Sequence, residues 1–248
     1  MAASCTAPRA VRLALLAVLA AAGTACTSAT ISAPGGGAAG SIPASIPATA
    51  PGPARAGGAW PGPQPVPAAL ARTELAALPV AAAGSMAGYS RDKFPHWAAQ
   101  GNSCDTREKV LARDGTGVRA DAACRAVAGT WFSVYDNATI TDSAKADADH
   151  LVPLANAWRS GAAQWTTEQR KAFANDLIHP QLLAVSASSN RAKGDQGPEA
   201  WKPPNRQIWC AYARAWTDVK TAYHLTVTTD EKSALNQMLD TCTTEAPR

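Results

Sequence analysis

A short segment in the middle of the chain combines a histidine with two carboxylates. Asp147, Asp149 and His150 stand immediately before the apolar run Leu-Val-Pro-Leu. A carboxylate is a hard oxygen donor of the kind that Mg²⁺ prefers. An imidazole has a reference pKa near neutrality and can take a proton from an attacking water. The segment therefore supplies parts that metal-assisted hydrolysis needs.

A second polar segment follows further along the chain. It places Asn190, Arg191, Lys193 and Asp195 directly after two serines. An amide oxygen can bind a metal ion, and the two cations can contact phosphate oxygens. Either segment alone has a structural explanation, because Asp often caps a helix and Asn often forms a turn. Their joint occurrence favours a functional site over two unrelated surface features.

Turn and capping patterns predict the elements that must position these side chains. Residues 129–141 contain extended, aromatic sequence on both sides of Asp-Asn and predict a β-hairpin. A third extended piece ends at His150, and Pro153 stands where a helix can begin. Residues 182–185 predict a short strand that leads into a loop holding Asn190.

Three helices are predicted by a capping residue with Glu or Gln three places later. The capping residues are Asp105, Thr166 and Thr228. A longer helix is predicted from Asn205 to about Tyr223, because apolar side chains recur there at helical spacing.

The N-terminal residues 1–25 have the pattern of a secretory signal peptide, with two arginines, a short apolar run and small residues. The apolar run is shorter than the roughly 20 residues that span a bilayer. Cys26 then stands where a lipid anchor can be attached, which would tether the protein to the outer face of the cytoplasmic membrane. Ordinary cleavage after Ala25 fits the sequence about as well and would release a secreted protein.

The next segment, residues 26–84, is dominated by Ala, Pro and Gly, with ten prolines. This composition predicts an extended, mobile linker with a short helical turn at residues 73–79. One domain then covers residues 85–248. It contains 19 Lys and Arg against 18 Asp and Glu. A nearly neutral domain does not favour wrapping of a duplex, so cations that bind nucleic acid must cluster locally.

Four cysteines fall within the predicted domain. They are Cys104, Cys124, Cys210 and Cys242. An even number in an exported domain predicts two disulfides. Of the three pairings, 104–124 with 210–242 is favoured because each bond closes a modest loop in its own half of the domain. A zinc site has less support, since the sequence contains no Cys-x-x-Cys pair.

The two polar segments together resemble the HNH endonuclease family. The similarity is to the ββα-metal nuclease domain of GmrSD-type restriction enzymes and to the second nuclease domain of RNA-guided DNA nucleases. It is clearest over residues 130–204, and weaker echoes of small secreted actinobacterial members extend over residues 79–242. The resemblance implies an α+β fold, with a ββα-metal core and additional helices.

By this resemblance, His150 is the general base, and Asp149 and Asn190 bind a divalent metal, Mg²⁺ or alternatively Mn²⁺. Asp147 would orient His150. The middle Asn of the family name has no clear match here; Gln181 is the nearest amide and Asn175 an alternative. The side chains that would steady phosphate oxygens or otherwise contact the substrate are Lys193, Arg191, Arg107 and Trp201.

The implied function is hydrolysis of phosphodiester bonds in DNA, with RNA as a second candidate, by a monomer outside the cell. Low sequence specificity is expected, because no DNA-reading module is recognisable. The alternative is a non-catalytic exported binding module tethered to the cell envelope. It explains the linker and the disulfides but leaves the pairing of the two motifs as coincidence. A zinc hydrolase acting on wall polymers is weaker, since there is no His-x-x-x-His pattern.

Overall fold

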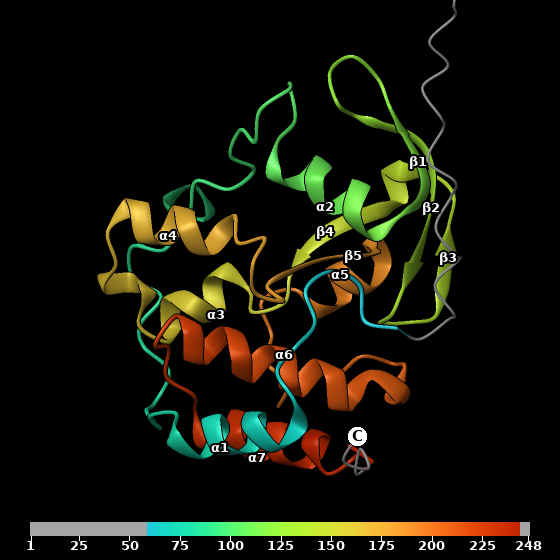
Figure 1. The fold of residues 1–248 in the computed structure, drawn as a ribbon. Helices are drawn as coiled ribbons and strands as arrows, with labels where there is room; N and C mark the ends of the chain where they lie inside the picture. The colour runs from blue at the N-terminus through green and yellow to red at the C-terminus, as the bar shows by residue number, and fades with distance from the viewer. Residues whose placement is uncertain (1–58, 244–248) are drawn as a thin grey trace, which may run out of the picture. The chain divides into compact units, whose positions relative to one another are not determined.

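Seven α-helices and five β-strands make up residues 59–243, the part of the chain that the computed structural model describes (Figure 1). The helices are α1 (Ala68–Ala77), α2 (Thr106–Asp114), α3 (Leu154–Arg159), α4 (Thr167–Ala174), α5 (Ala187–Lys193), α6 (Trp209–Ala222) and α7 (Thr229–Leu239). The strands are β1 (Thr116–Ala120), β2 (Ala126–Ser133), β3 (Ala138–Ile140), β4 (Ala146–His150) and β5 (Leu182–Ser186). The predicted α+β class is confirmed. The predicted signal peptide and Cys26 lie outside the described residues.

The five strands form two small antiparallel sheets, one with the order β1-β2-β3 and one that pairs β4 with β5. The predicted hairpin is β2 and β3, with Trp131 opposite Ile140. Asn137 in its turn has a positive φ of 58°, which Asn tolerates better than most residues. The hairpin prediction is therefore confirmed.

The two polar segments lie on a unit formed by β4, β5 and α5. His150 at the end of β4 lies opposite Leu182 at the start of β5. Helix α5 follows β5 directly, because Ser186 ends the strand and its hydroxyl caps the helix by accepting from the Ser189 N–H. Asn190 was predicted in a loop and instead lies on this helix. Because the Ser186 hydroxyl caps the helix, the helix begins at Ala187, where the sequence had predicted a loop.

The three predicted helix caps are all present. The Asp105 carboxylate accepts from the Glu108 N–H, and Thr166 and Thr228 each form a complete capping box. The predicted long helix is a 3-10 turn followed by α6, whose buried face lies at the centre of the larger apolar core. A smaller core lies between α2 and the two sheets, with Val110, Leu111 and Trp131 fully buried. This second core fixes β4 and β5 from the side of α2 (Figure 1).

Residues 60–80 belong to the folded unit, although their composition predicted a linker. Helix α1 packs against α6 and α7 (Figure 1). Trp60, Ala71, Leu75 and Leu78 are buried in the larger core. Ala71 and Leu75 are four residues apart and therefore share one face of α1. These four apolar side chains are enough to dock the segment. The high content of Pro and Ala had predicted a linker because composition does not show which apolar residues share a face.

A chain that begins at Ser85 should consequently be much less stable than one that begins at Ala59. Removal of the buried Leu75 side chain alone should cost about 2 to 5 kcal/mol. Thermal unfolding followed by circular dichroism would measure the difference between the two chains. Equal melting temperatures would show that docking of α1 contributes nothing to stability.

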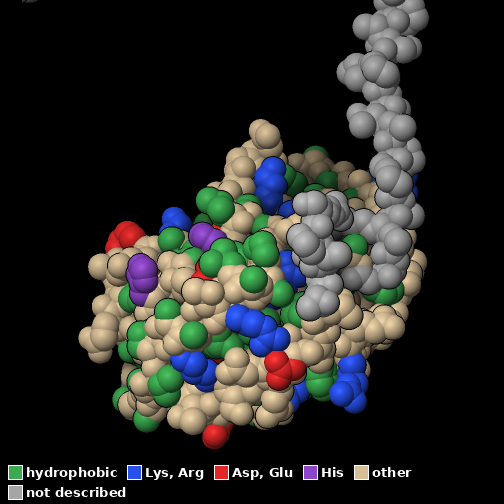
Figure 2. Space-filling view, turned by 60° about the horizontal axis from the view of Figure 1, so that its bottom comes forward, with side chains coloured by type: hydrophobic (Ala, Val, Ile, Leu, Met, Phe, Trp, Pro, Cys, Tyr) green, Lys and Arg blue, Asp and Glu red, His purple; other side chains and the backbone are tan. Residues whose placement is uncertain are grey.

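Both predicted disulfides are confirmed, Cys104–Cys124 and Cys210–Cys242. The first ties the start of α2 to the connection between β1 and β2, and the second ties α6 to the segment after α7. No helix among the described residues is both long and apolar enough to cross a membrane. On the face shown in Figure 2, described Lys and Arg side chains are scattered among hydrophobic and other residues, in keeping with the nearly neutral domain.

Candidate active site

A cavity of about 250 Å³ lies at the end of β4 and beside α5. Four of the predicted site residues line it, namely Asp149, His150, Asn190 and Arg191. The other polar side chains in its wall are those of Tyr89, Arg91 and Asp195. The fold thus brings together side chains from the two polar segments, as their joint occurrence predicted.

The carboxylate of Asp149 is buried, and each of its oxygens accepts one hydrogen bond. Its Oδ1 accepts from the Lys193 ammonium at 2.9 Å, and its Oδ2 accepts from the Tyr135 hydroxyl at 2.7 Å. Burial raises the pKa of Asp149, and the charge of Lys193 acts in the opposite direction. The pair holds the carboxylate in one orientation, with its remaining lone pairs as acceptors for a further ligand.

Lys193 therefore has a different place from the one that the resemblance implied. Its side chain is fully buried, and its ammonium donates to both Asp149 Oδ1 and the His150 carbonyl oxygen. Burial lowers the pKa of Lys193, with the negative charge of Asp149 opposing the shift. An ammonium enclosed in this way cannot contact a phosphate. It holds the Asp149 carboxylate and the end of β4 instead.

Asn190 and Lys193 lie three residues apart on α5, and they contact Asp147 and Asp149, two residues apart on β4. Three residues of helix rise about 4.5 Å and two residues of strand about 6.7 Å, and the long lysine side chain bridges the difference. Asn190 Nδ2 donates to Asp147 Oδ2 at 2.9 Å. Since a carboxylate can only accept, the side-chain carbonyl oxygen of Asn190 points elsewhere and accepts no hydrogen bond from a described residue.

Asp147 was expected to orient His150, and the structure gives it another partner. Successive side chains on a strand point to opposite faces, so Asp147 and Asp149 share the face covered by α5. His150 belongs to the other face. The hydrogen bond from Asn190 makes Asp147 a positioning residue for that amide instead.

The imidazole of His150 is almost completely buried. Its Nε2 lies 2.8 Å from the Ala174 carbonyl oxygen, which can only accept, so Nε2 carries the proton. Trp97 stacks on the ring with a centroid distance of 5.3 Å. Burial lowers the pKa of His150 to about 3, and the hydrogen bond to Ala174 opposes this shift. The ring is therefore neutral at ordinary pH and keeps an unprotonated Nδ1.

The side-chain amides of Gln181 and Asn175 hold the chain segments on either side of this imidazole. Gln181 accepts from the Val152 N–H at 3.1 Å and donates to the Val152 carbonyl at 2.9 Å. It therefore brackets the segment that follows His150. Asn175 acts on the other side, donating to the Pro95 carbonyl and accepting from the Ala98 N–H. That contact fixes the segment that carries Trp97.

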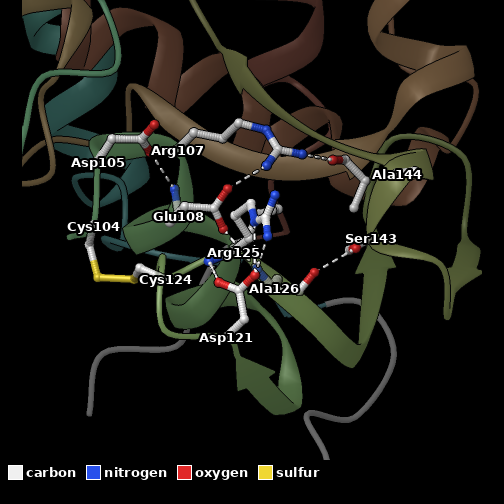
Figure 3. A network of polar contacts seen from close by, with 12 residues as sticks. Cys104, Asp105, Arg107, Glu108, Asp121, Cys124, Arg125, Ala126, Ser143 and Ala144 are labelled. Carbon is white, nitrogen blue, oxygen red and sulfur yellow. Dashed lines mark hydrogen bonds and ion pairs between the residues drawn. A yellow bond between two sulfur atoms is a disulfide. The ribbon is translucent and has the colours of Figure 1, made fainter. Parts of the chain in front are cut away.

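Two other predicted substrate contacts lie away from the cavity. Arg107 forms an ion pair with Glu108 at 2.7 Å and donates to the Ala146 carbonyl, within the polar network beside the Cys104–Cys124 bond (Figure 3). The indole of Trp201 packs edge-on against the ring of Tyr135 at 5.3 Å, as part of the core. Neither side chain lines the candidate site. Arg191, in contrast, is exposed at its rim.

Four further residues belong to the site without having been predicted, one of them Tyr89 in the cavity wall. Tyr135 holds Asp149, Trp97 covers the imidazole, and Arg91 lines the cavity while donating to His96 Nε2 at 3.3 Å. Arg91 falls within residues 79–242, over which the weaker resemblance to secreted HNH proteins extends, and this was the available signal for it. No local pattern links Tyr135 or Trp97 to residues so far along the chain.

The depressed pKa of His150 predicts a loss of stability in acid. Between pH 6.5 and about 3 the unfolded chain binds a proton at this residue that the folded chain does not. The free energy of unfolding is therefore unaffected by this proton above pH 6.5 and decreases as the pH falls from 6.5 towards 3. Denaturant unfolding in EDTA should show the wild type losing about 2 to 3 kcal/mol more than His150→Phe between pH 7 and pH 4.5. Equal losses in both proteins would contradict this.

Comparison with known proteins decides the family. The family model described as GmrSD restriction endonucleases, C-terminal domain, matches residues 105–238, which is more than half of the chain. The chain belongs to this family. A relative from Arthroderma benhamiae, described as an uncharacterized secreted protein, is 56% identical over 189 residues, covering 74% of this chain and 93% of the relative. No solved structure matches. A nuclease-type function and a nucleic acid substrate follow from membership of the GmrSD family.

The metal-binding capacity of this GmrSD-type domain rests on few side chains. Within residues 59–243, no group of three or more His, Cys, Asp or Glu side chains could hold a metal ion. Mg²⁺ needs no such group, because it is commonly bound by one or two protein oxygens, waters and substrate phosphates. Asp149 and Asn190 both line the cavity, and their side-chain oxygens are hard donors. The residues present therefore fit a magnesium-type ion and do not fit a structural zinc site.

Proposed function

We propose that this GmrSD-type domain is an HNH-type endonuclease that hydrolyses phosphodiester bonds in DNA, with RNA as a second candidate substrate. The observation that carries the proposal is that His150, Asp149 and Asn190 line one cavity, with the His150 imidazole held in one tautomer by the Ala174 carbonyl. A binding module would leave the meeting of these three residues at one cavity as coincidence.

In this proposal, His150 takes the proton from the attacking water through Nδ1. The Ala174 carbonyl keeps the other ring nitrogen protonated, and Trp97 limits access of bulk water to the ring. Because burial lowers the pKa of His150 to about 3, the base is already unprotonated at neutral pH. A base with so low a pKa in the free protein gains strength once a water and an anionic phosphate occupy the cavity.

Asp149 and Asn190 would hold the divalent ion, with Mg²⁺ preferred and Mn²⁺ as an alternative. When bound, the ion would stabilise negative charge on the phosphate and the leaving oxygen. Lys193 and Tyr135 keep the Asp149 carboxylate in place, and Asp147 keeps the Asn190 amide turned so that its carbonyl oxygen is available. Arg191 at the rim would contact a phosphate of the substrate.

The domain would act outside the cell, as a monomer and with low sequence specificity. Two disulfides support export, and the Arthroderma benhamiae relative is described as secreted. Release into the medium or tethering through a lipid on Cys26 are both open to an exported chain. Cys26 lies outside the described residues.

The test is cleavage of plasmid and of single-stranded RNA by the full, oxidised exported chain with Mg²⁺, Mn²⁺ or EDTA. We expect nicking of the plasmid with either metal and none with EDTA. An oxidised, folded protein that cleaves neither substrate with any divalent metal would refute the proposal and favour the binding module.

A further inference from the structure

A second cavity, of about 390 Å³, shares Arg191 with the candidate active site. It is lined by the end of β3, by the segment leading to β4 and by the start of α5. Its polar side chains are those of Thr139, Thr141, Asp142, Lys145, Ser188 and Arg191, apart from the capping Ser186. Two cations and three hydroxyls therefore face a space that shares Arg191 with the site proposed for hydrolysis.

Neither cation of this cavity forms an ion pair with a described residue. Arg107, Arg113, Arg125 and Arg159 each pair with an acidic side chain. Lys145 and Arg191 are exposed, and neither forms an ion pair or side-chain hydrogen bond with a described residue. A cation that forms no ion pair is available to an external anion.

The walls of this second cavity suit a sugar-phosphate backbone better than a base. No aromatic ring is among the described residues that line it, and its apolar contacts are small, from Ile140 and Ala187. Proteins that hold unpaired bases stack them on aromatic side chains, whereas phosphates are held by cations and hydroxyls. The chemistry of the lining therefore indicates recognition of the backbone without reading of the sequence.

We propose that the second cavity binds the phosphate backbone of a DNA duplex next to the cleaved bond, with Lys145 as its main cation and Arg191 shared between the two cavities. This rests on the proposed nuclease function. Asp142 lies in the same cavity and opposes an anion there, although one of its oxygens is occupied as the cap of the following turn. The opposing charge keeps the contact weak, as suits an enzyme that must release its product.

The inference is tested by binding of a fluorescein-labelled DNA duplex to the full exported chain carrying His150→Ala, over a series of salt concentrations. In that background, Lys145→Ala should weaken binding several-fold and reduce the slope of log K against log salt by about 0.9. Asp142→Asn should tighten binding several-fold, because it removes a repelling charge and keeps the oxygen that caps the turn. A variant that had lost its structure would bind the duplex less tightly. Opposite effects of Lys145→Ala and Asp142→Asn on affinity would therefore exclude unfolding as the cause.

Arg119→Ala is the matched control. Arg119 is exposed on β1, at the opposite edge of the sheet from β3, and should leave the slope unchanged. If Lys145→Ala behaves like Arg119→Ala while the wild-type chain still cleaves DNA, the inference fails and the nuclease proposal stands. If the wild type neither binds nor cleaves nucleic acid, the proposed function fails and the inference fails with it.

Discussion

Replacement of His150 with alanine should lower the rate of DNA cleavage by about 10²- to 10⁴-fold, the usual contribution of a general base. The imidazole is the buried base of the candidate site, and its tautomer is set by the Ala174 carbonyl. No other described imidazole lines the cavity. Binding of the duplex should change little, because a buried and neutral ring makes no electrostatic contact with the phosphate backbone.

The measurement is initial-rate plasmid nicking with Mg²⁺ for the wild type and His150→Ala, with circular dichroism to verify folding. His224→Asn is a suitable control, since His224 is exposed and has a positive φ of 51° that Asn tolerates. It should retain full activity. Unchanged cleavage by His150→Ala would refute the mechanism as written.

Lys193→Met should destabilise the metal-free protein by about 3 to 5 kcal/mol, because it leaves the buried Asp149 carboxylate without its cation. A divalent ion at the same carboxylate should restore part of this loss. A site filled to about 100 times its dissociation constant would return about 2.7 kcal/mol. Denaturant unfolding with Mn²⁺ and with EDTA measures both effects.

The chain offers a matched control for this experiment in its second buried lysine. Lys220 is also fully buried and pairs with Glu231 at 2.9 Å, the same distance as between Lys193 and Asp149. Lys220→Met should therefore cost a similar amount, yet Mn²⁺ should restore nothing, since Glu231 does not line the candidate site. An equal response of both variants to Mn²⁺ would show that Asp149 is not a metal ligand.

Much of the local structure was predictable because its causes are local. A capping residue and its partner lie three positions apart, so Asp105, Thr166 and Thr228 could be assigned as helix starts from the sequence. The hairpin and the two disulfides followed from turn residues and loop lengths. The two polar segments were expected to meet because their residue types fit one chemistry. They do line one cavity.

The direction and burial of each polar side chain could not be predicted in the same way. The type of Lys193 suggested a phosphate contact, and the packing of α5 on β4 turned it inward to Asp149. Strand alternation moved Asp147 away from His150 and toward Asn190. Arg107 had an acidic neighbour on its own helix, and that ion pair holds it outside the site.

The sequence by itself determined which groups are available for chemistry and where helices and strands begin, because those depend on residue type and short spacing. Tertiary structure alone decided that Tyr135 holds Asp149, that Trp97 covers His150, and that α1 completes the larger core. These contacts join segments far apart in the chain, and their partners are selected by the packing of the whole domain. The resulting burial, and not the residue type, gives His150 its low pKa.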